Sequence, residues 1–180
     1  MKFAGILTAI VLLTAVALGP RGAAQAQTAG TRAADELVLE MKDAFRKSDR
    51  KRLAALLPQV RGHVLEPWAA YWELKSRLVD ASNEEIRTFL RTYAGSYQED
   101  RLRNDWLLLL GQVRDWATFM AQYPSFRMND DREVRCYALL TDFNATGADV
   151  AAQVEALWLA QRDADDGFAH APQVLLQARK

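Results

Sequence analysis

The sequence predicts an all-α fold, built as a right-handed superhelical solenoid of helical hairpins. Apolar residues recur at helical spacing from Leu37 onward, and no segment alternates apolar and polar residues over the length of a strand. A shift of 30 residues also aligns one short amphipathic segment with a later one. A helical unit of this length buries its apolar face only by stacking on its neighbours, which favours a solenoid.

The first 26 residues are predicted to be a signal peptide, which leaves 27–180 as one α-helical domain. Lys2 supplies the positive start, 3–18 is an apolar run, and 24–26 reads Ala-Gln-Ala. Cleavage is expected between Ala26 and Gln27. The apolar run is shorter than the roughly 20 residues of a spanning helix, so a retained membrane anchor is the weaker interpretation. Export implies an oxidising compartment.

The amino-terminal helices are indicated by apolar residues three and four positions apart. These residues fall in four groups along the chain: Leu37, Met41, Ala44 and Phe45; Leu53, Leu56 and Leu57; Trp68, Tyr71, Trp72 and Leu78; Ile86, Phe89, Leu90 and Tyr93. Ser82 with Glu85 forms a capping box ahead of the fourth group. The basic run 46–52 lies between two of these patterns and reads as a solvated turn between helices.

The carboxyl-terminal half continues the helical pattern. A longer helix is marked by Leu102, Trp106, Leu109, Leu110 and Val113, a later one by Val150, Val154, Leu157 and Trp158, and a last one by Val174, Leu175 and Leu176. Thr146 with Asp149 is a weaker capping box ahead of Val150. The expected stop signals are Gly95, Gly111, Pro124 and the turn 144–147.

The internal repeat resembles the hairpins of tetratricopeptide-like arrays. It aligns 88–93 with 118–123, where Thr-Phe-Leu-x-x-Tyr faces Thr-Phe-Met-x-x-Tyr, and places Trp116 opposite Ile86. Further along it pairs Asp100, Leu109 and Leu110 with Asp130, Leu139 and Leu140.

Composition and charge exclude several classes of function. Lys plus Arg and Asp plus Glu each number 23, so no net field draws the chain to nucleic acid or to an anionic membrane. Cys136 is the one cysteine of the sequence and cannot form a disulfide within this chain. His63 and His170 are far apart and have no ligand-spaced partners, so we expect neither a metal site nor a cofactor.

Neighbouring acidic residues are the candidates for acid catalysis, because a positioned carboxyl group can act as a general acid. Such groups occur at Glu84 and Glu85, Glu99 and Asp100, Asp130 and Asp131, and Asp163 with Asp165 and Asp166. All lie at expected helix starts or turns, where carboxylates cap amides or face solvent. No catalytic residue is therefore predicted.

Four segments together resemble the amino-terminal helical superhelix of the soluble lytic murein transglycosylases. They are PWAAYWELKSRL (67–78), EDRLRNDWLLLLG (99–111), DWATFMAQYPSF (115–126) and MNDDREVRCYALL (128–140). The resemblance implies a periplasmic, peptidoglycan-cleaving family, in which a curved helical platform carries a lysozyme-like catalytic domain. That domain cuts MurNAc-GlcNAc bonds and leaves 1,6-anhydro ends.

The catalytic signature of that family, a Glu-Ser pair followed by a Gly-Leu-Met-Gln-like segment, is absent from the 180 residues. We therefore expect an inactive platform truncated before the catalytic domain, with peptidoglycan strands as the partner of that missing domain. Self-association through the open end of the solenoid is also expected. Cys136 matches a position at which many members of that family have a cysteine. The resemblance implies a disulfide partner near 166–167, but Phe168 stands there and no second cysteine is present. The alternative is a free-standing periplasmic module that binds a protein or a glycan.

The aromatic side chains have two interpretations. Trp68, Tyr71 and Trp72 could stack on sugar rings, and Trp106 and Trp116 could line a groove. At helical spacing such rings are more often core, because their burial is strongly favourable. The polar residues around Trp106 are interpreted as inter-helix bonds of the solenoid: Arg101, Arg103, Asn104 and Asp105.

Overall fold

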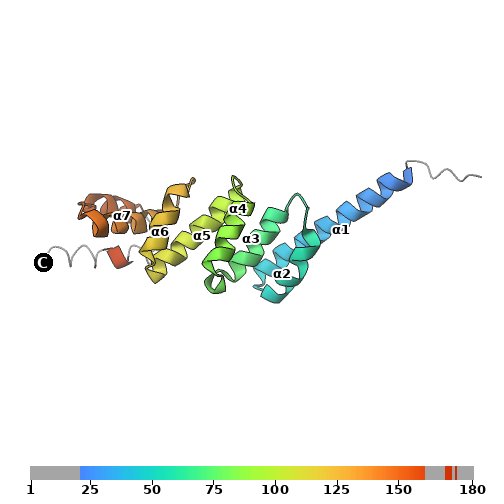
Figure 1. Ribbon diagram of the computed structural model, residues 1–180, viewed down its shortest axis with the longest axis horizontal. Coiled ribbons are helices and arrows are strands. Elements are labelled where there is room, and N and C mark those ends of the chain that lie inside the picture. Colours follow the sequence, from blue (N-terminus) through green and yellow to red (C-terminus); the bar gives the residue numbers. More distant parts are fainter. Residues whose placement is uncertain (1–20, 161–168, 172, 174–180) are drawn as a thin grey trace, which may run out of the picture.

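The computed structural model describes residues 21–160, 169–171 and 173 (Figure 1). Within this part of the chain every regular element is helical and no strand occurs, which confirms the all-α class. Among the described helices none is both long and apolar enough to cross a membrane. Several predictions fall outside the described residues: the signal-peptide segment 1–20, the acids Asp163, Asp165 and Asp166, Phe168, and the last expected helix with Val174, Leu175 and Leu176.

Eight α-helices follow one another in the described chain, with short 3₁₀ turns at 57–60, 78–80 and 123–125. They are α1 (Arg21–Arg46), α2 (Arg50–Leu56), α3 (Glu66–Ser76), α4 (Asn83–Thr92), α5 (Tyr97–Val113), α6 (Trp116–Gln122), α7 (Arg132–Thr146) and α8 (Ala151–Leu159). The expected cleavage pair, Ala26 and Gln27, falls within the span of α1.

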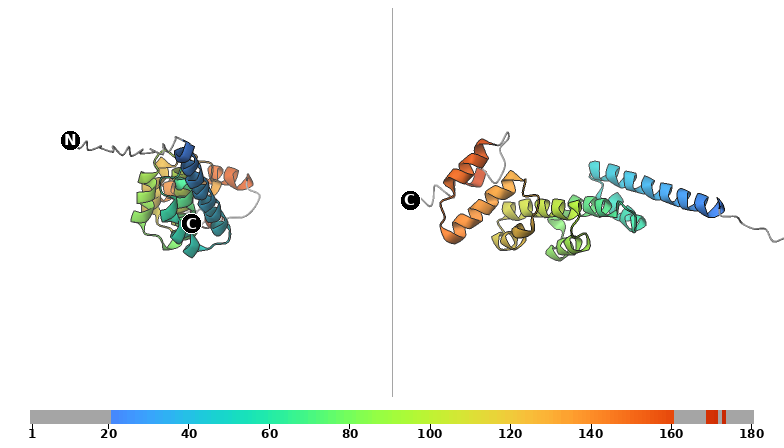
Figure 2. Two further views of the ribbon diagram at one scale, coloured as in Figure 1. Left: turned by 90° about the vertical axis from the view of Figure 1, so that its right-hand side faces the viewer. Right: turned by 90° about the horizontal axis from the view of Figure 1, so that it is seen from above.

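The helices form a row of stacked hairpins. α1 packs on α3, α3 on α5, and α5 on α7, while the shorter α2, α4 and α6 pack against these from the side. α4 and α6 lie on the same side of α5, and α1 at one end and α7 with α8 at the other rise on the opposite side (Figure 2). The stack is therefore curved, with the open faces of α3 and α5 on the inside of the curve.

The hydrophobic core is divided along the stack. One cluster joins α1, α2 and the start of α3 around Met41, Leu53 and Val60, and a second runs from α3 to α8 around Leu102 and Trp106. Leu57 and Trp72 pack against both clusters. Each hairpin thus buries its apolar face against its sequence neighbours, as repeat proteins do.

The helix starts show that the structural period is 33 residues. Asp49, Ser82 and Asp115 are the N-caps of α2, α4 and α6, and each side chain accepts a hydrogen bond from the backbone N–H three residues later, at 2.9, 3.2 and 3.1 Å. The predicted capping box of Ser82 and Glu85 is present in full. Four residues after each cap lies a fully buried side chain: Leu53, Ile86 and Phe119.

The 30-residue register is therefore wrong for the helix starts. It aligns the carboxyl-terminal ends of α4 and α6, where Tyr93 and Tyr123 are the C-cap residues. α4 has 10 residues and α6 has 7, and this difference of one helical turn shifts the register from 33 to 30. The counterpart of Ile86 is Phe119, and not Trp116.

A second hydrogen-bond arrangement recurs with the same 33-residue period, at the starts of α3 and α5. The Glu66 carboxylate accepts a hydrogen bond from the Gly62 N–H at 2.6 Å, and Glu99 accepts one from Gly95 at 3.0 Å. Both glycines have positive φ, +77° and +83°, which a residue with a Cβ adopts only with strain. Each of these hydrogen bonds thus links the glycine loop to the first turn of the helix that follows it.

Two other expected boundaries shift. Gly111 does not stop a helix, because α5 continues to Val113 and ends at Arg114, which has φ 62°. The predicted capping box of Thr146 and Asp149 does not form, because Thr146 is the last residue of α7. The Asp149 side chain accepts a hydrogen bond from the Ala151 N–H at 3.1 Å at the start of α8. Gly147 does end α7, with φ 70°.

Candidate functional site

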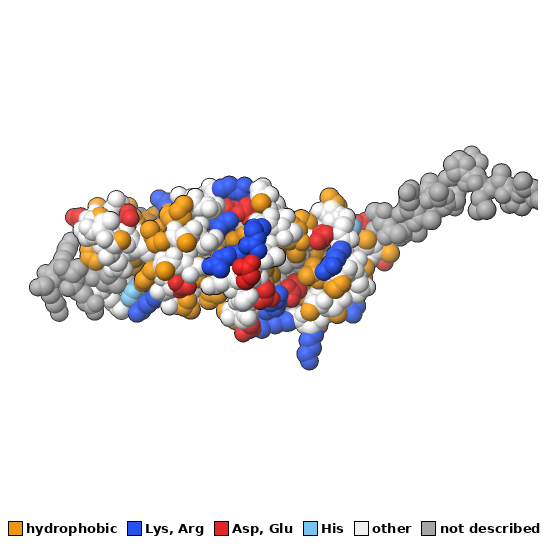
Figure 3. All heavy atoms as spheres, in the orientation of Figure 1, with side chains coloured by type: hydrophobic (Ala, Val, Ile, Leu, Met, Phe, Trp, Pro, Cys, Tyr) orange, Lys and Arg blue, Asp and Glu red, His pale blue; other side chains and the backbone are white. Residues whose placement is uncertain are grey.

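The acidic residues around α4 cap the helix or face solvent, as the sequence predicts. The Glu85 side chain accepts hydrogen bonds from the Ser82 N–H and from the Arg77 guanidinium, at 2.9 and 2.8 Å. These bonds favour the charged form and lower the pKa of Glu85 to about 2. Glu84 pairs with Arg91 at 2.7 Å. On the face that carries α4, basic and acidic side chains are intermixed (Figure 3).

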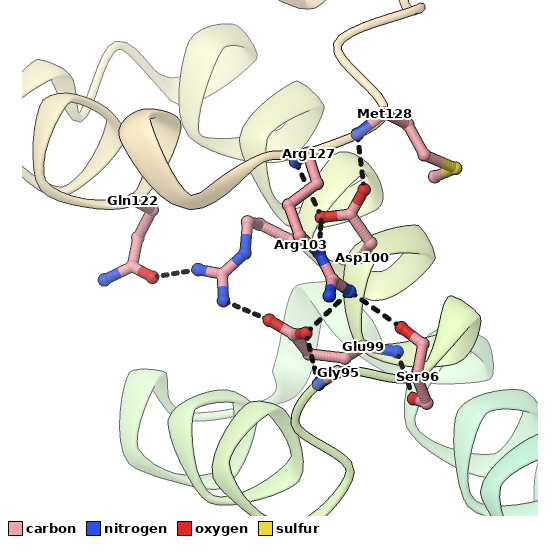
Figure 4. Close-up of polar contacts among 8 residues, drawn as sticks. All are labelled: Gly95, Ser96, Glu99, Asp100, Arg103, Gln122, Arg127 and Met128. Carbon is pink, nitrogen blue, oxygen red and sulfur yellow. Dashed lines mark hydrogen bonds and ion pairs between the residues drawn. The ribbon is translucent and has the colours of Figure 1, made fainter.

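Glu99 and Asp100 are buried, and of the two expected roles they have the one of binding backbone amides and not the one of facing solvent. Their side chains are 8% and 2% exposed. Glu99 accepts hydrogen bonds from Arg103 at 2.5 Å and from Arg127 at 3.0 Å, in addition to the Gly95 N–H (Figure 4). Burial without these partners would cost several kcal/mol, since an unpaired buried charge is strongly disfavoured.

Asp100 holds the segment that leads to α7. Its two carboxylate oxygens accept hydrogen bonds from the backbone N–H groups of Arg127 and Met128, at 3.0 and 2.8 Å (Figure 4). Asp131 in turn is the N-cap of α7 and accepts a bond from the Asn104 amide at 3.1 Å. Glu99, Asp100 and Asp131 are therefore committed to contacts that join α5 with the segment before α7 and with the start of α7.

The histidines lie apart, as the sequence predicts. The His63 Nε2 lies 2.9 Å from an Asp35 carboxylate oxygen, and the Leu65 N–H donates to Nδ1 at 3.1 Å, which assigns the proton to Nε2. Burial, with a contribution from the nearby Arg114, lowers the pKa of His170. Within the described residues no three His, Cys, Asp or Glu side chains are grouped to hold a metal ion.

The open faces of α3 and α5 carry the remaining candidate residues. On α3 the outward positions follow helical spacing, with Trp68, Trp72 and Lys75 half-buried and Val79 exposed just beyond the helix. On α5 the corresponding positions are Tyr97, Arg101, Leu108 and Gln112. A depression of about 250 Å³ lies between these faces and includes Lys75, Asp105 and Gln112 in its lining. We call this region the open face.

Four aromatic rings form a row across the open face. The ring centroids of Phe45 and Trp72 are 6.4 Å apart, those of Trp72 and Trp68 are 5.9 Å apart, and those of Trp68 and Tyr97 are 5.7 Å apart. The row thus crosses from α1 over α3 to α5. Phe45, Trp68 and Trp72 are partly buried, and Tyr97 is 53% exposed. We call these four residues the aromatic row.

The aromatic residues pack in or against the core, as expected, but to different degrees. Tyr71 and Trp106 are buried, as expected. Trp116 is half-buried and packs on the Tyr137 ring, with centroids 6.0 Å apart. Trp68 and Trp72 are half-buried and pack against the core from the side of the open face.

A polar cluster lies beside the aromatic row. The buried Asp105 carboxylate accepts a hydrogen bond from the Tyr71 hydroxyl at 2.8 Å and pairs with the Lys75 ammonium at 2.6 Å. Burial, together with the Asp105 charge, raises the pKa of Tyr71 above its ordinary value. The Arg101 guanidinium also interacts with Tyr71 and Asp105. The prediction of inter-helix contacts is thus confirmed for Arg103, Asn104 and Asp105.

Comparison with known proteins gives one informative likeness. No known family matches the sequence, and no curated protein does. Among solved structures, the fold is similar to that of a 70-kDa soluble lytic transglycosylase in complex with bulgecin A, with a TM-score of 0.62 and 16% sequence identity. The likeness covers 82% of this chain and 24% of the transglycosylase, so the chain spans about a quarter of that protein's length.

Proposed function

We propose that this chain is the non-catalytic helical platform of a periplasmic peptidoglycan lytic transglycosylase. The observation that carries the proposal is the fold likeness to the 70-kDa soluble lytic transglycosylase over 82% of the chain. In this proposal the hairpins belong to a right-handed superhelix, the signal peptide is removed between Ala26 and Gln27, and a separate catalytic domain cleaves the glycan.

The contacts of the acidic residues support a scaffold role. Glu99 and Asp100 are buried in bonds that join α5 to the segment before α7, and Glu85 caps α4. A general acid must reach the glycosidic oxygen of its substrate, which carboxylates committed in this way cannot do. The chain by itself is therefore expected to be inactive on peptidoglycan.

The genomic sequence beyond codon 180 tests this proposal most directly. We expect a reading frame, in the same or a shifted phase, that encodes further helical hairpins and then a Glu-Ser pair followed by a Gly-Leu-Met-Gln-like segment. Sacculi incubated with the purified chain should release no anhydro-muropeptides. Release by this chain that is lost on mutation of one of its own acids would contradict the platform role.

A free-standing periplasmic interaction module is the second candidate, and the aromatic row on the open face favours it. Tyr97, at the α5 end of the row, is 53% exposed and is available to a partner without any additional domain. A genomic frame that ends at codon 180 with no transglycosylase signature downstream would favour this second function.

A further inference from the structure

We infer that His63 is a proton-controlled link between α1 and the loop 61–65, which leads to α3. When the imidazole takes up a proton, it releases the backbone of this loop and keeps its contact with α1. The inference rests on the two hydrogen bonds of this ring and is independent of the proposed function.

Both ring nitrogens of His63 are engaged, and the two bonds require opposite roles. The Leu65 N–H donates to Nδ1 at 3.1 Å, so Nδ1 must be without a proton. Nε2 lies 2.9 Å from a carboxylate oxygen of Asp35, which accepts the Nε2 proton. An imidazolium carries a proton on each nitrogen and cannot accept a hydrogen bond. The ring therefore makes both bonds only in its neutral form.

The bond to Leu65 fixes the entry of the chain into α3. Leu65 is the N-cap residue of α3, and its carbonyl accepts hydrogen bonds from the Trp68 and Ala69 N–H groups at 3.0 and 3.2 Å. A leucine side chain cannot cap a helix, so the backbone of Leu65 is held from outside by the imidazole. Val64 and Leu65 are both exposed, so release of the loop changes an apolar part of the surface.

The contact with α1 survives protonation. Among the described residues Asp35 is the acid that pairs with His63. Nε2 carries a proton in both forms of the ring, so this contact changes from a neutral hydrogen bond to an ion pair. The Asp35 side chain is 57% exposed, and an exposed ion pair contributes little stability. The effect of a proton is therefore confined to the loop.

The other charged groups around the ring are engaged elsewhere or exposed. The Glu66 carboxylate, at the start of α3, accepts hydrogen bonds from the loop and from the Tyr93 hydroxyl at the end of α4. Glu40 of α1 pairs with Arg52 of α2, and the 3₁₀ turn 57–60 has no charged residue. The exposed charged residues nearest in the chain are Arg32 and Glu36 of α1 and Arg61 of the loop. Asp35 is thus the acid available to a charged ring.

NMR of the full chain between pH 8 and pH 5, the range in which histidine side chains change charge, tests the inference. The exchange protection of the Leu65 N–H, corrected for the intrinsic pH dependence of exchange, should fall about two- to twelvefold toward pH 5. This range corresponds to the loss of one hydrogen bond of about 0.5–1.5 kcal/mol. The fall should share its pH midpoint with the His63 ring signals. The Ala70 N–H, within α3, should keep its protection.

Two substitutions separate the two bonds of the ring. His63→Asn places an uncharged amide oxygen near the Nδ1 position, so Leu65 should stay protected at every pH while the contact with Asp35 is lost. His63→Gln extends an amide N–H toward Asp35 and offers Leu65 no acceptor, so the Leu65 protection should be low at every pH. His170 is kept in both variants, and a pH response that belongs to His170 would survive in both.

Four results would overturn the inference. They are a Leu65 protection that is constant from pH 8 to pH 5, a change whose midpoint differs from that of the His63 ring, an equal loss of protection at Val38 of α1, and an unchanged pH response in His63→Asn. The first three are measured on the wild-type chain, so the inference can fail even where a variant does not fold.

Discussion

Gly111 of α5 lies directly against the ring of Tyr137 of α7. A Cβ at Gly111 would overlap the Cδ2, Cε2 and Cγ atoms of that ring, and φ at Gly111 is not positive. The glycine is thus required for the close approach of two neighbouring long helices, and its conformational freedom is not used. Both residues are buried.

Gly111→Ala should therefore destabilise the fold. Alanine favours a helix by about 1 kcal/mol over glycine, but overpacking a buried contact costs about 1–3 kcal/mol, and the overlap with Tyr137 involves ring atoms held by α6 and α7. We expect a lower free energy of unfolding in urea. Tyr137→Leu in the Gly111→Ala background should recover part of the loss. A stabilised Gly111→Ala variant would show that α5 and α7 are further apart than described.

Asp100→Ala should lower the free energy of unfolding by about 1–3 kcal/mol, since it removes the buried carboxylate that accepts hydrogen bonds from the Arg127 and Met128 N–H groups. Urea denaturation at neutral pH measures the effect. Asp130→Ala, at an exposed position near the start of α7, is the matched control and should change stability by less than about 0.5 kcal/mol. Equal effects of the two substitutions on stability would contradict the conclusion that Asp100 links α5 to the segment before α7.

The charge of Glu85 should stabilise the fold only above acidic pH. The pKa of Glu85 is lowered from 4.5 to about 2 in the folded chain, so its contribution is complete above pH 4.5 and is lost as the pH falls toward 2. The difference in melting temperature between wild type and Glu85→Gln should accordingly shrink from pH 6 to pH 3. Ser82→Ala removes the uncharged half of the capping box and should lower the melting temperature throughout this range. A pH-independent Glu85→Gln effect would contradict the assigned bonds.

The Cys136 thiol should react slowly with thiol reagents in the folded protein and rapidly in denaturant. Its side chain is fully buried in the core cluster that joins α3 to α8. The rate of labelling measured against urea concentration should follow the unfolding curve obtained by circular dichroism. Rapid labelling without denaturant would place α7 at the surface.

The sequence by itself determined the helices and most of their starts. Periodicity acts over three or four residues, and so does the capping box of Ser82 and Glu85, so these features are visible in a short window of sequence. The chain positions of α4 and α5 follow from such local signals. Confirmation by the structure is strongest for them.

Tertiary structure decided what each helical face touches. Trp72 and Trp106 stand in equally helical patterns, yet one is half-buried in the aromatic row and the other is buried in the core. Glu99 and Asp100 resemble any capping pair in sequence, but Arg127 and Met128, nearly 30 residues later, hold them inside. Gly111 resembles a helix stop in the sequence, but in the structure it lies inside α5 and allows the close contact with the Tyr137 ring. The reason is physical: helical spacing defines which residues share a face, and only the neighbouring hairpins decide whether that face is covered.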